Sequence, residues 1–571
     1  MATKTEHRHL FKVTIDGMSL SADVEPKMVM AMVEDTRNAP DLFVLSFLDP
    51  DRKGPNSVLD KTRAKIGCSA EISVVSGVET SGHPLFKGEV TAIETEFEES
   101  GTHTIIRGFD KSHRLFRGTK TKAWTNMSFS DIASAIANEA KLKVGQIDQT
   151  FPIYDHVPQF AMSDWDFLKW IAAESNREMA VGDGKFEFRR ATPASDAPPV
   201  ARPTLELKDL LRFHAMVSAA DQVKEVVARG WDYASREAVM GKARAVATGA
   251  KVGTTPAEIA HEVGDAVFVE VNSPSDDPQH LDNVAHSIAE KIGAAHAEIE
   301  FEAHGNHELR AGTPISFAGA GKLFDGQGVI TTSRHVYEPN KGYRTFGYVT
   351  GKQDRSLFAL TGGSNGNGKD SGPLGARRIE GVVPAIVENN ADPKELGRVK
   401  LYFPWLDGKP EPEKPEGYVS DWARVVQPGA GAGMGWSLLP EVNDEVIVAF
   451  EQGDIRYPIV LGGIFKEKTE LYGGAVPRLD RNTKAVNKRK FQTPLGHKLN
   501  FFDGGPGVGI GLMTADGKQA IILDQSGSRI IISAPKLDVS VDGDIDFDAK
   551  GSIKVEAKGS LTLKGKTVNI N

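Results

Sequence analysis

Residues 363–370 read GSNGNGKD and differ by one substitution from a phosphate-binding loop. Such a loop has two glycines separated by four residues, a lysine, and a serine or threonine whose hydroxyl holds Mg²⁺. Here Asp370 takes the hydroxyl position, where a carboxylate would repel the phosphate, and Gly372 and Pro373 follow where a helix has to begin. We interpret the stretch as a flexible linker. A nucleotide-dependent assembly factor, which would depend on Lys369, is the third of the functions considered.

Histidines and carboxylates give two further candidate sites. His296, His304 and His307 could be offered as metal ligands. Zinc sites often place two histidines on one face of a helix, whereas His304 and His307 lie three apart across a glycine. We expect these histidines to face solvent or to be satisfied in the core. Glu94 and Glu96 could form a glycosidase pair, but we interpret them as the solvated face of a strand.

Nucleophilic and aromatic candidates are also weak. The one cysteine, Cys68, has Lys65 as its only basic neighbour and no histidine beside it, so we expect a buried, inert thiol. Residues 362–366 read GGSNG and have the G-x-S-x-G spacing, but they belong to the predicted linker, so we predict no nucleophile elbow. Trp165, Phe167 and Trp170 could form a ligand platform, but we expect them in the core or at a subunit contact. The sequence therefore predicts no enzyme, no cofactor and no metal site. A tail-associated cell-wall hydrolase, with an active site in the N-terminal region, is the alternative.

Composition restricts the kind of protein. The chain has 571 residues, a formal net charge of −9, 40 % hydrophobic residues and 58 glycines, which describes a folded, turn-rich chain of three or four domains. No long run of lysine or arginine occurs, which argues against nucleic acid as a partner. The N-terminus lacks an apolar stretch of signal-peptide length, and no run of about 20 apolar residues could span a bilayer. We expect synthesis and assembly in the bacterial cytoplasm without a signal peptide.

Strand and helix patterns alternate in the first half of the chain. Short apolar runs bounded by turn residues predict strands at 10–15, 41–48, 70–78 and 103–110. A serine and an aspartate in capping-box spacing begin two predicted helices, over 128–142 and 163–176. A third helix is predicted over 279–297 from its 3.6-residue apolar period. Further along, β-rich segments separated by glycine and proline turns predict a small barrel over 378–468.

The C-terminal residues contain an internal repeat. From Asp542 the sequence divides into DGDIDFDA, KGSIKVEA, KGSLTLKG and KTVNIN, with turn glycines Gly543, Gly551 and Gly559 spaced by eight. Alternate residues of the first three blocks are apolar and predict a needle core of Ile545, Phe547, Ile553, Val555, Leu561 and Leu563. Strands this short bury one narrow face, which a single chain would leave in water. Three chains wound round one axis would close into a prism that encloses this face and has no sheet edges.

Three stretches together resemble the VgrG-like spike proteins of contractile injection systems. Residues 108–140 and 155–176 resemble the family's hub, with a Q-x-x-x-S-D-x-x-F pattern from Gln159 to Phe167. The octad repeat resembles the family's needle. The most specific stretch resembles the family's OB-fold barrel through Gly397, Arg398, Val399, Lys400, Trp405, Trp422, Arg424, Val425, Pro440, Glu445, Val446, Gly453, Asp454 and Pro458.

The resemblance implies a mainly β fold with a few helices. It divides the chain into a hub of β-barrel subdomains and helices over 1–361, a flexible linker over 362–377, an OB-fold barrel over 378–468, a connector over 469–490 and a trimeric, intertwined β-helix or prism needle over 491–571. The implied function is structural: a homotrimeric central spike that links the inner tube and baseplate to a membrane-puncturing tip and can carry cargo. A small PAAR-like tip protein would contact Val568, Ile570 and Asn571. The target membrane would be contacted only on firing.

Departures from the family pattern refine this expectation. Pro404 stands where many relatives place a histidine, Ile455 stands where many place a proline, and the needle is short. These features resemble an extracellular phage-tail-like particle, released or acting on a target cell, more than a type VI secretion spike. Residues 466–490 leave no room for a lysozyme domain between barrel and needle, because a minimal domain needs about 50 residues.

Overall fold

The structure is a computed structural model that describes residues 9–37, 39–50, 57–76, 82–182, 184–194, 203–232, 237–271, 275–349, 378–407, 418–465, 479–504 and 507–570. The chain divides into two compact units, Met1–Ile464 and Phe465–Asn571. We call the first unit the body and the second the needle unit. The glycine-rich stretch at 362–372 and the linker predicted at 362–377 lie outside the described residues.

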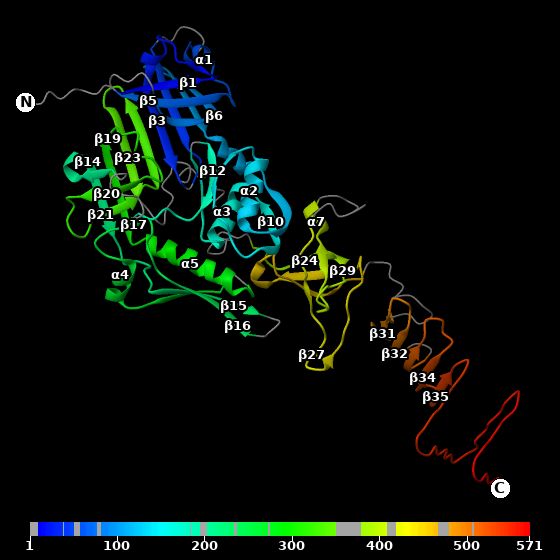
Figure 1. The fold of residues 1–571 in the computed structure, drawn as a ribbon. Coiled ribbons are helices and arrows are strands. Elements are labelled where there is room, and N and C mark those ends of the chain that lie inside the picture. Colours follow the sequence, from blue (N-terminus) through cyan, green and yellow to red (C-terminus); the bar gives the residue numbers. More distant parts are fainter. Residues whose placement is uncertain are drawn as a thin grey trace, which may run out of the picture. The chain divides into compact units, whose positions relative to one another are not determined.

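One large sheet dominates the body (Figure 1). Its strands are β1 His9–Ile15, β2 Met18–Ser19, β3 Met28–Thr36, β4 Leu42–Asp49, β5 Ser69–Ser76, β6 His83–Glu98, β7 Gly101–Phe109, β14 Leu210–Val217, β19 Ala297–His304, β22 Thr332–Glu338 and β23 Gly342–Val349. They lie in the order β14-β19-β23-β22-β3-β4-β7-β6-β5-β1-β2. The antiparallel pair β3 and β22 therefore joins the first strands of the chain to strands that come much later in the sequence.

Two hydrophobic cores lie on this sheet, one in each half. The first, around Phe11, Phe43 and Phe47, is closed by the short helix α1 Ser57–Thr62. The second, around Phe301 and Phe317, lies between β19 and a second sheet in the order β13-β20-β21-β17. The strands of that sheet are β13 Thr204–Glu206, β17 Ala250–Lys251, β20 Pro314–Ala318 and β21 Gly326–Val329.

A helical subdomain follows the first β region. It contains α2 Phe129–Glu139, α3 Asp164–Glu174 and the strands β8 Lys120–Met127, β9 Lys143–Ile147, β10 Tyr154–Met162, β11 Glu178–Gly182 and β12 Lys185–Arg189. Ser128 caps α2 in a complete capping box with Asp131, and Ser163 caps α3 by accepting the backbone N–H of Asp166. The aromatic side chains Trp165, Phe167 and Trp170 are buried in this core, so the core interpretation of these residues is confirmed.

A third subdomain places a long helix against a small sheet. The sheet consists of β15 Glu225–Asp232, β16 Glu237–Arg244 and β18 Val267–Glu270. Its strands β15 and β16 pack against α5 Pro278–Ala294, which Figure 1 shows running across them. The helix buries Leu281, Val284 and Ile288, the period predicted from sequence. A further helix, α4 Pro256–Val263, begins at a Thr255 capping box with Glu258 and was not expected.

The barrel forms the last part of the body. Its strands are β24 Val382–Asn389, β25 Lys400–Tyr402, β26 Arg424–Val425, β29 Glu445–Phe450 and β30 Pro458–Gly463, in the order β25-β24-β29-β30-β26. A short helix, α7 Pro404–Asp407, follows β25, and a small hairpin of β27 Ala430–Gly431 and β28 Met434–Gly435 precedes β29. The hub residue Phe160 packs into the barrel core.

The needle unit begins with a five-stranded antiparallel meander. Its strands are β31 Lys488–Gln492, β32 Lys498–Phe502, β33 Gly509–Met513, β34 Ala520–Asp524 and β35 Arg529–Ser533. The first strand starts three residues before the predicted needle boundary at 491. Residues 534–570, which include the octad repeat, form no strand in the single chain. A strand needs a neighbour for its backbone hydrogen bonds, and one chain supplies none here.

The mainly β architecture with a few helices is confirmed, and so are the three predicted helices, each ending two or three residues earlier than predicted. No helix among the described residues is long and apolar enough to cross a membrane.

Candidate functional site

The meander of the needle unit has one apolar face. Strand pairing aligns two rows of side chains across the five strands. Residues of the same parity along a strand point to the same side, so both rows share a face, with Arg489 at the end of one row. We call its nine apolar residues the needle face: Phe491, Leu499, Phe501, Ile510, Leu512, Ile521, Leu523, Ile530 and Ile532. All but Leu499 are exposed, up to 70 % for Ile530. Nothing in the described chain covers this face.

The octad repeat continues the exposure of apolar side chains. Leu537, Val539 and Val541, together with the six predicted needle-core residues from Ile545 to Leu563, are each at least 50 % exposed, and Phe547 reaches 80 %. The apolar residues that the sequence places at alternate positions are therefore exposed to solvent in the single chain. Their burial, which the prediction of a needle core requires, is not present in one chain.

The octad glycines mark bends of the chain. The backbone bends at Gly543, Gly551 and Gly559. None of the three has a φ in the left-handed region, and a Cβ added at any of them would meet open space. A requirement for glycine at these positions must therefore come from other chains. The predicted role of these residues as needle turns stays a prediction.

The predicted contact residues for a tip protein lie at the end of the same segment. Val568 is 50 % exposed and Ile570 is 85 % exposed. Asn571 lies outside the described residues. The end of the chain thus offers two uncovered apolar side chains, and their partner stays a prediction.

The barrel motif residues build turns and ion pairs. Gly397 has φ 69° and Gly453 has φ 80°, and only glycine adopts such values without strain. Between the turns, Arg398 donates to both carboxylate oxygens of Asp392 at 2.7 and 2.9 Å. Arg398 holds the pKa of this carboxyl well below its usual range. The ion pair explains why the glycine and the arginine are adjacent in the motif.

The remaining motif residues have different surroundings. Val399 is buried in the barrel core and bridges to Ala423. The half-buried Trp422 lies 5.9 Å from the guanidinium of Arg398, and Arg424 donates to Glu451 at 2.9 Å. Trp405 lies in α7.

Asp454 of the motif leads to a buried network between barrel and hub. Arg456 donates to Asp454 Oδ2 at 2.6 Å and to Glu174 Oε2 of α3 at 2.8 Å. Glu174 also accepts the indole N–H of Trp170 at 2.9 Å. Both partners of the Arg456–Glu174 pair are buried, with side chains 10 % and 2 % exposed. We call these residues, with His280 of α5, the junction network.

Burial sets the electrostatics of the junction network. Burial disfavours the charge of Arg456, but the carboxylates of Asp454 and Glu174 outweigh it and hold the pKa of Arg456 well above its usual range. Burial lowers the pKa of His280 against the opposing carboxylate of Glu174. His280 Nδ1 lies 3.0 Å from the hydroxyl of Tyr154. The network therefore contains one arginine held between two carboxylates, with a histidine whose neutral form burial favours, an arrangement suited to fastening two subdomains.

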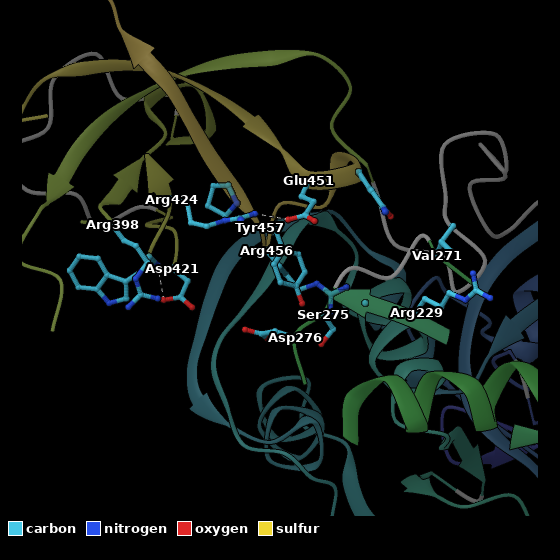
Figure 2. Close-up of a pocket in the computed structure, with 14 residues that line it drawn as sticks. Arg229, Val271, Ser275, Asp276, Arg398, Asp421, Arg424, Glu451, Arg456 and Tyr457 are labelled. Atoms are coloured by element: carbon cyan, nitrogen blue, oxygen red, sulfur yellow. Dashed lines mark hydrogen bonds and ion pairs between the residues drawn. The ribbon is translucent and has the colours of Figure 1, made fainter. Parts of the chain in front are cut away.

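A cavity of about 280 Å³ lies beside the network, between β15 and the barrel (Figure 2). Arg424 and Glu451 face each other on the barrel side, while Arg229 and Asp276 come from the hub. Counting the carboxylates that pair with its arginines, the cavity is lined by groups of both signs. Four arginines and three acidic residues line it directly, so a ligand would meet charges of both signs.

The rival chemistries find little support among the described residues. No group of three or more His, Cys, Asp or Glu there could hold a metal ion. His304 is exposed, as expected, and His296 is buried and bonded to the carbonyl of Gly293. Cys68 is half-buried rather than buried, because it sits at the edge of the first core. Glu94 and Glu96 are exposed on β6, so the strand-face interpretation is confirmed.

One serine and one histidine do lie together. Ser333 Oγ is 3.0 Å from His335 Nε2. Both side chains are fully buried, and the serine hydroxyl donates to the carbonyl of Leu309. A substrate could reach neither group, so this pair is part of the core.

Comparison with known families now identifies the chain. The family described as "Alg8 N-terminal domain" matches residues 6–338, which is more than half of the length of this chain. The chain belongs to the Alg8 N-terminal domain family. A second family, the type VI secretion system/phage-baseplate injector OB domain, matches residues 383–465. This range coincides with β24 to β30 and confirms the OB-fold assignment of the barrel.

Individual relatives of this Alg8 N-terminal domain protein agree with the resemblance. It is 30 % identical over 158 residues to the type VI secretion system spike protein VgrG2a of Pseudomonas aeruginosa, covering 26 % of this chain and 18 % of that protein. It is 37 % identical over 109 residues to the spike protein VgrG3 of Vibrio cholerae, covering 19 % and 10 %. The chain thus spans less than a fifth of the length of these curated relatives.

Structural similarity extends further along the chain. The solved structure of a Francisella PdpA-VgrG complex, lidded, matches with a TM-score of 0.54 at 7 % identity, covering 93 % of this chain and 80 % of that chain. A lidless form of the complex matches with a TM-score of 0.52 at 8 % identity, over 92 % and 98 %. This similarity shows the fold, and the resemblance to VgrG-like spike proteins is confirmed.

Sequence reasoning missed the junction network of the Alg8 N-terminal domain protein. Glu174 and Arg456 are 282 residues apart, and no spacing rule connects them. A signal was available at Asp454, where the motif places an acid two residues before an arginine, but it does not indicate Glu174 as the partner.

Proposed function

We propose that this chain is the structural central spike of a contractile injection machine and that it works as a homotrimer. The needle face and the octad side chains carry the proposal, because a folded unit that exposes so many aligned apolar side chains needs other copies to cover them. Covering a half-exposed aliphatic side chain is worth on the order of 1 kcal/mol. The match of residues 383–465 to the type VI secretion system/phage-baseplate injector OB domain supports the same function.

Each region then has a mechanical task. The hub joins the inner tube and baseplate proteins to the spike, and the barrel is the collar where three copies gather. In the needle, backbone hydrogen bonds between chains replace those that residues 534–570 lack in the single chain. The assembled needle concentrates the force of sheath contraction on a small tip, where a PAAR-like protein covers Val568 and Ile570. No step of this task requires catalysis by the chain.

The particle that carries the spike is part of the proposal. We assign it to the phage-tail-like type that is assembled in the bacterial cytoplasm and is released or acts on a target cell. The departures at Pro404 and Ile455 support this assignment.

Solution mass tests the trimer. Light scattering of the full chain should give three times 61.7 kDa. A chain ending at Ile464, the last residue of the body, should give a smaller assembly or a monomer. If the full chain is a monomer at all concentrations, the spike proposal loses the observation that carries it.

A further inference from the structure

The charges of the octad segment separate along the chain. Residues 537–548 contain five aspartates and no basic residue, whereas residues 549–571 contain five lysines and one glutamate. The net charge per chain thus changes from −5 to +4 within one repeat. In a trimer the terminal segment carries three times this positive charge. We call residues 549–571 the basic segment.

The lysines of the basic segment follow the octad period. Lys550, Lys558 and Lys566 are spaced by eight and occupy the position that Asp542 has in the first block. Lys550 and Lys558 lie directly before Gly551 and Gly559, where the chain bends. In the proposed needle these bends are the corners of each block, which would separate the lysines from the apolar residues at alternate positions.

These charges are exposed and largely uncompensated. All the described residues of the basic segment are exposed. Lys554 is paired, with Glu556 at 2.6 Å. Among the described residues, Lys550, Lys558, Lys564 and Lys566 have no ion-pair partner. Each chain thus presents a row of free ammonium groups that leads toward its C-terminal end.

The chemistry of the row favours one kind of partner. The segment contains no arginine, and arginine is the residue that recognises carboxylates or phosphates with a fixed bidentate geometry. Lysine acts as a point charge, and clusters of exposed lysines bind anionic lipid headgroups without a shaped pocket.

We propose that the basic segment binds the phosphate groups of an anionic membrane surface along its sides. The inference rests on the proposed spike function, since it assigns the lysine row to the surface that the needle meets. The aspartates of residues 537–548 would be repelled by the same surface. The position where the net charge of the segment changes sign therefore marks how far along the needle the membrane surface attracts it.

Vesicle flotation of the full-length protein tests this assignment. The probes are vesicles of phosphatidylcholine with phosphatidylglycerol, against phosphatidylcholine alone, each at low and high salt. The variant K558Q/K564Q/K566Q should lose at least about tenfold of its binding to the anionic vesicles. The matched variant K558R/K564R/K566R keeps the charge and should bind within about twofold of the unchanged chain.

A second control separates place from net charge. D544N/D546N/D548N raises the net charge of the first block by three per chain, the same size of change with the opposite sign, and it should leave binding unchanged or raise it slightly. Binding that is equal on neutral vesicles, or that the glutamine variant retains, overturns the inference. The inference is also overturned if the glutamine variant binds vesicles normally and forms a trimer of lower thermal stability. The lysines would then pair with aspartates of neighbouring chains.

Light scattering of every variant keeps the two proposals apart. A trimer that does not bind anionic vesicles contradicts the lipid assignment alone. The same holds if the lysines bind only an acidic tip protein. A monomer contradicts the spike function.

Discussion

The body and the needle unit treat the same residue types in opposite ways. In the body, Ile288 and Phe186 are 5 % and 0 % exposed, whereas Ile530 and Phe547 in the needle unit are 70 % and 80 % exposed. Both regions have regular apolar patterns with the expected periods. A pattern therefore determines which face is apolar, and the length and closure of the fold determine whether the chain can cover that face itself.

Charged residues placed on the needle face should have the largest effect, because they should prevent the needle units from associating and leave the body unchanged. Leu512→Asp combined with Leu523→Asp would bury two carboxylates in the trimer, which costs several kcal/mol per chain. We expect complete loss of the trimer by light scattering and an unchanged unfolding transition of the body. Gln525→Asp, at an exposed turn of the same sheet, adds one carboxylate outside the needle face and should leave the trimer intact. A trimeric double variant would show that the needle face is not an interface.

Removing a charge from the junction network should destabilise the body and leave the needle unit unchanged. Glu174→Gln leaves Arg456 buried with Asp454 as its only carboxylate, so we expect the body to lose about 3 kcal/mol of stability. Glu451→Gln breaks the more exposed pair with Arg424 and should cost less than about 1 kcal/mol. Denaturant unfolding of the body measures both. Equal costs for the two variants would contradict the fastening role of the network.

A fall in pH should lower the stability of the body but not that of the needle unit, by less than the substitution in the junction network. Burial lowers the pKa of His280 and lowers that of His335 to about 3, with Arg310 and His307 adding to the effect at His335. A folded pKa below the unfolded value of about 6.5 gives stability that is present above pH 6.5 and lost as the pH falls. His335 should therefore cost the body about 1.4 kcal/mol per pH unit below pH 6.5, and His280 should add a loss in the same direction.

The needle unit contains one histidine, His497, at an exposed position. Unfolding of the chain ending at Ile464, followed from about pH 7.5 to about pH 5.5, should therefore show this loss. Dissociation of the needle should not follow it. A body whose stability is constant over this range would contradict the assignment of neutral buried histidines.

The effect expected at Gly551 is confined to the trimer. A Cβ there has open space in the single chain, so Gly551→Val should leave the body and the monomer unchanged. We expect the trimer alone to lose about 1–3 kcal/mol per chain through contact with its neighbours. Heating in detergent followed by gel electrophoresis measures this, with Ser552→Val as the matched control. Unchanged trimer stability would contradict the predicted role of the octad glycine.

Local rules predicted the parts of the fold that depend on nearby residues. Ser128 and Ser163 identified their helices because a cap involves residues three apart. The same rule applies at Thr255 and Glu258, where it was overlooked. The octad side chains were predicted to form one face, but their cover lies on other chains. The Glu174–Arg456 pair depends on the packing of two subdomains, which no local pattern encodes.

The pairing of β3 with β22 has a consequence for the way the chain is made. Arg334 of β22 reaches Glu34 of β3 across 300 residues of sequence. The ribosome must therefore deliver most of the hub before β3 acquires its second neighbour. Until then the first sheet has an open edge, which can pair with the wrong strand. Since such distant contacts form slowly, we expect hub folding to be the slow step of biogenesis and the stage most sensitive to expression temperature.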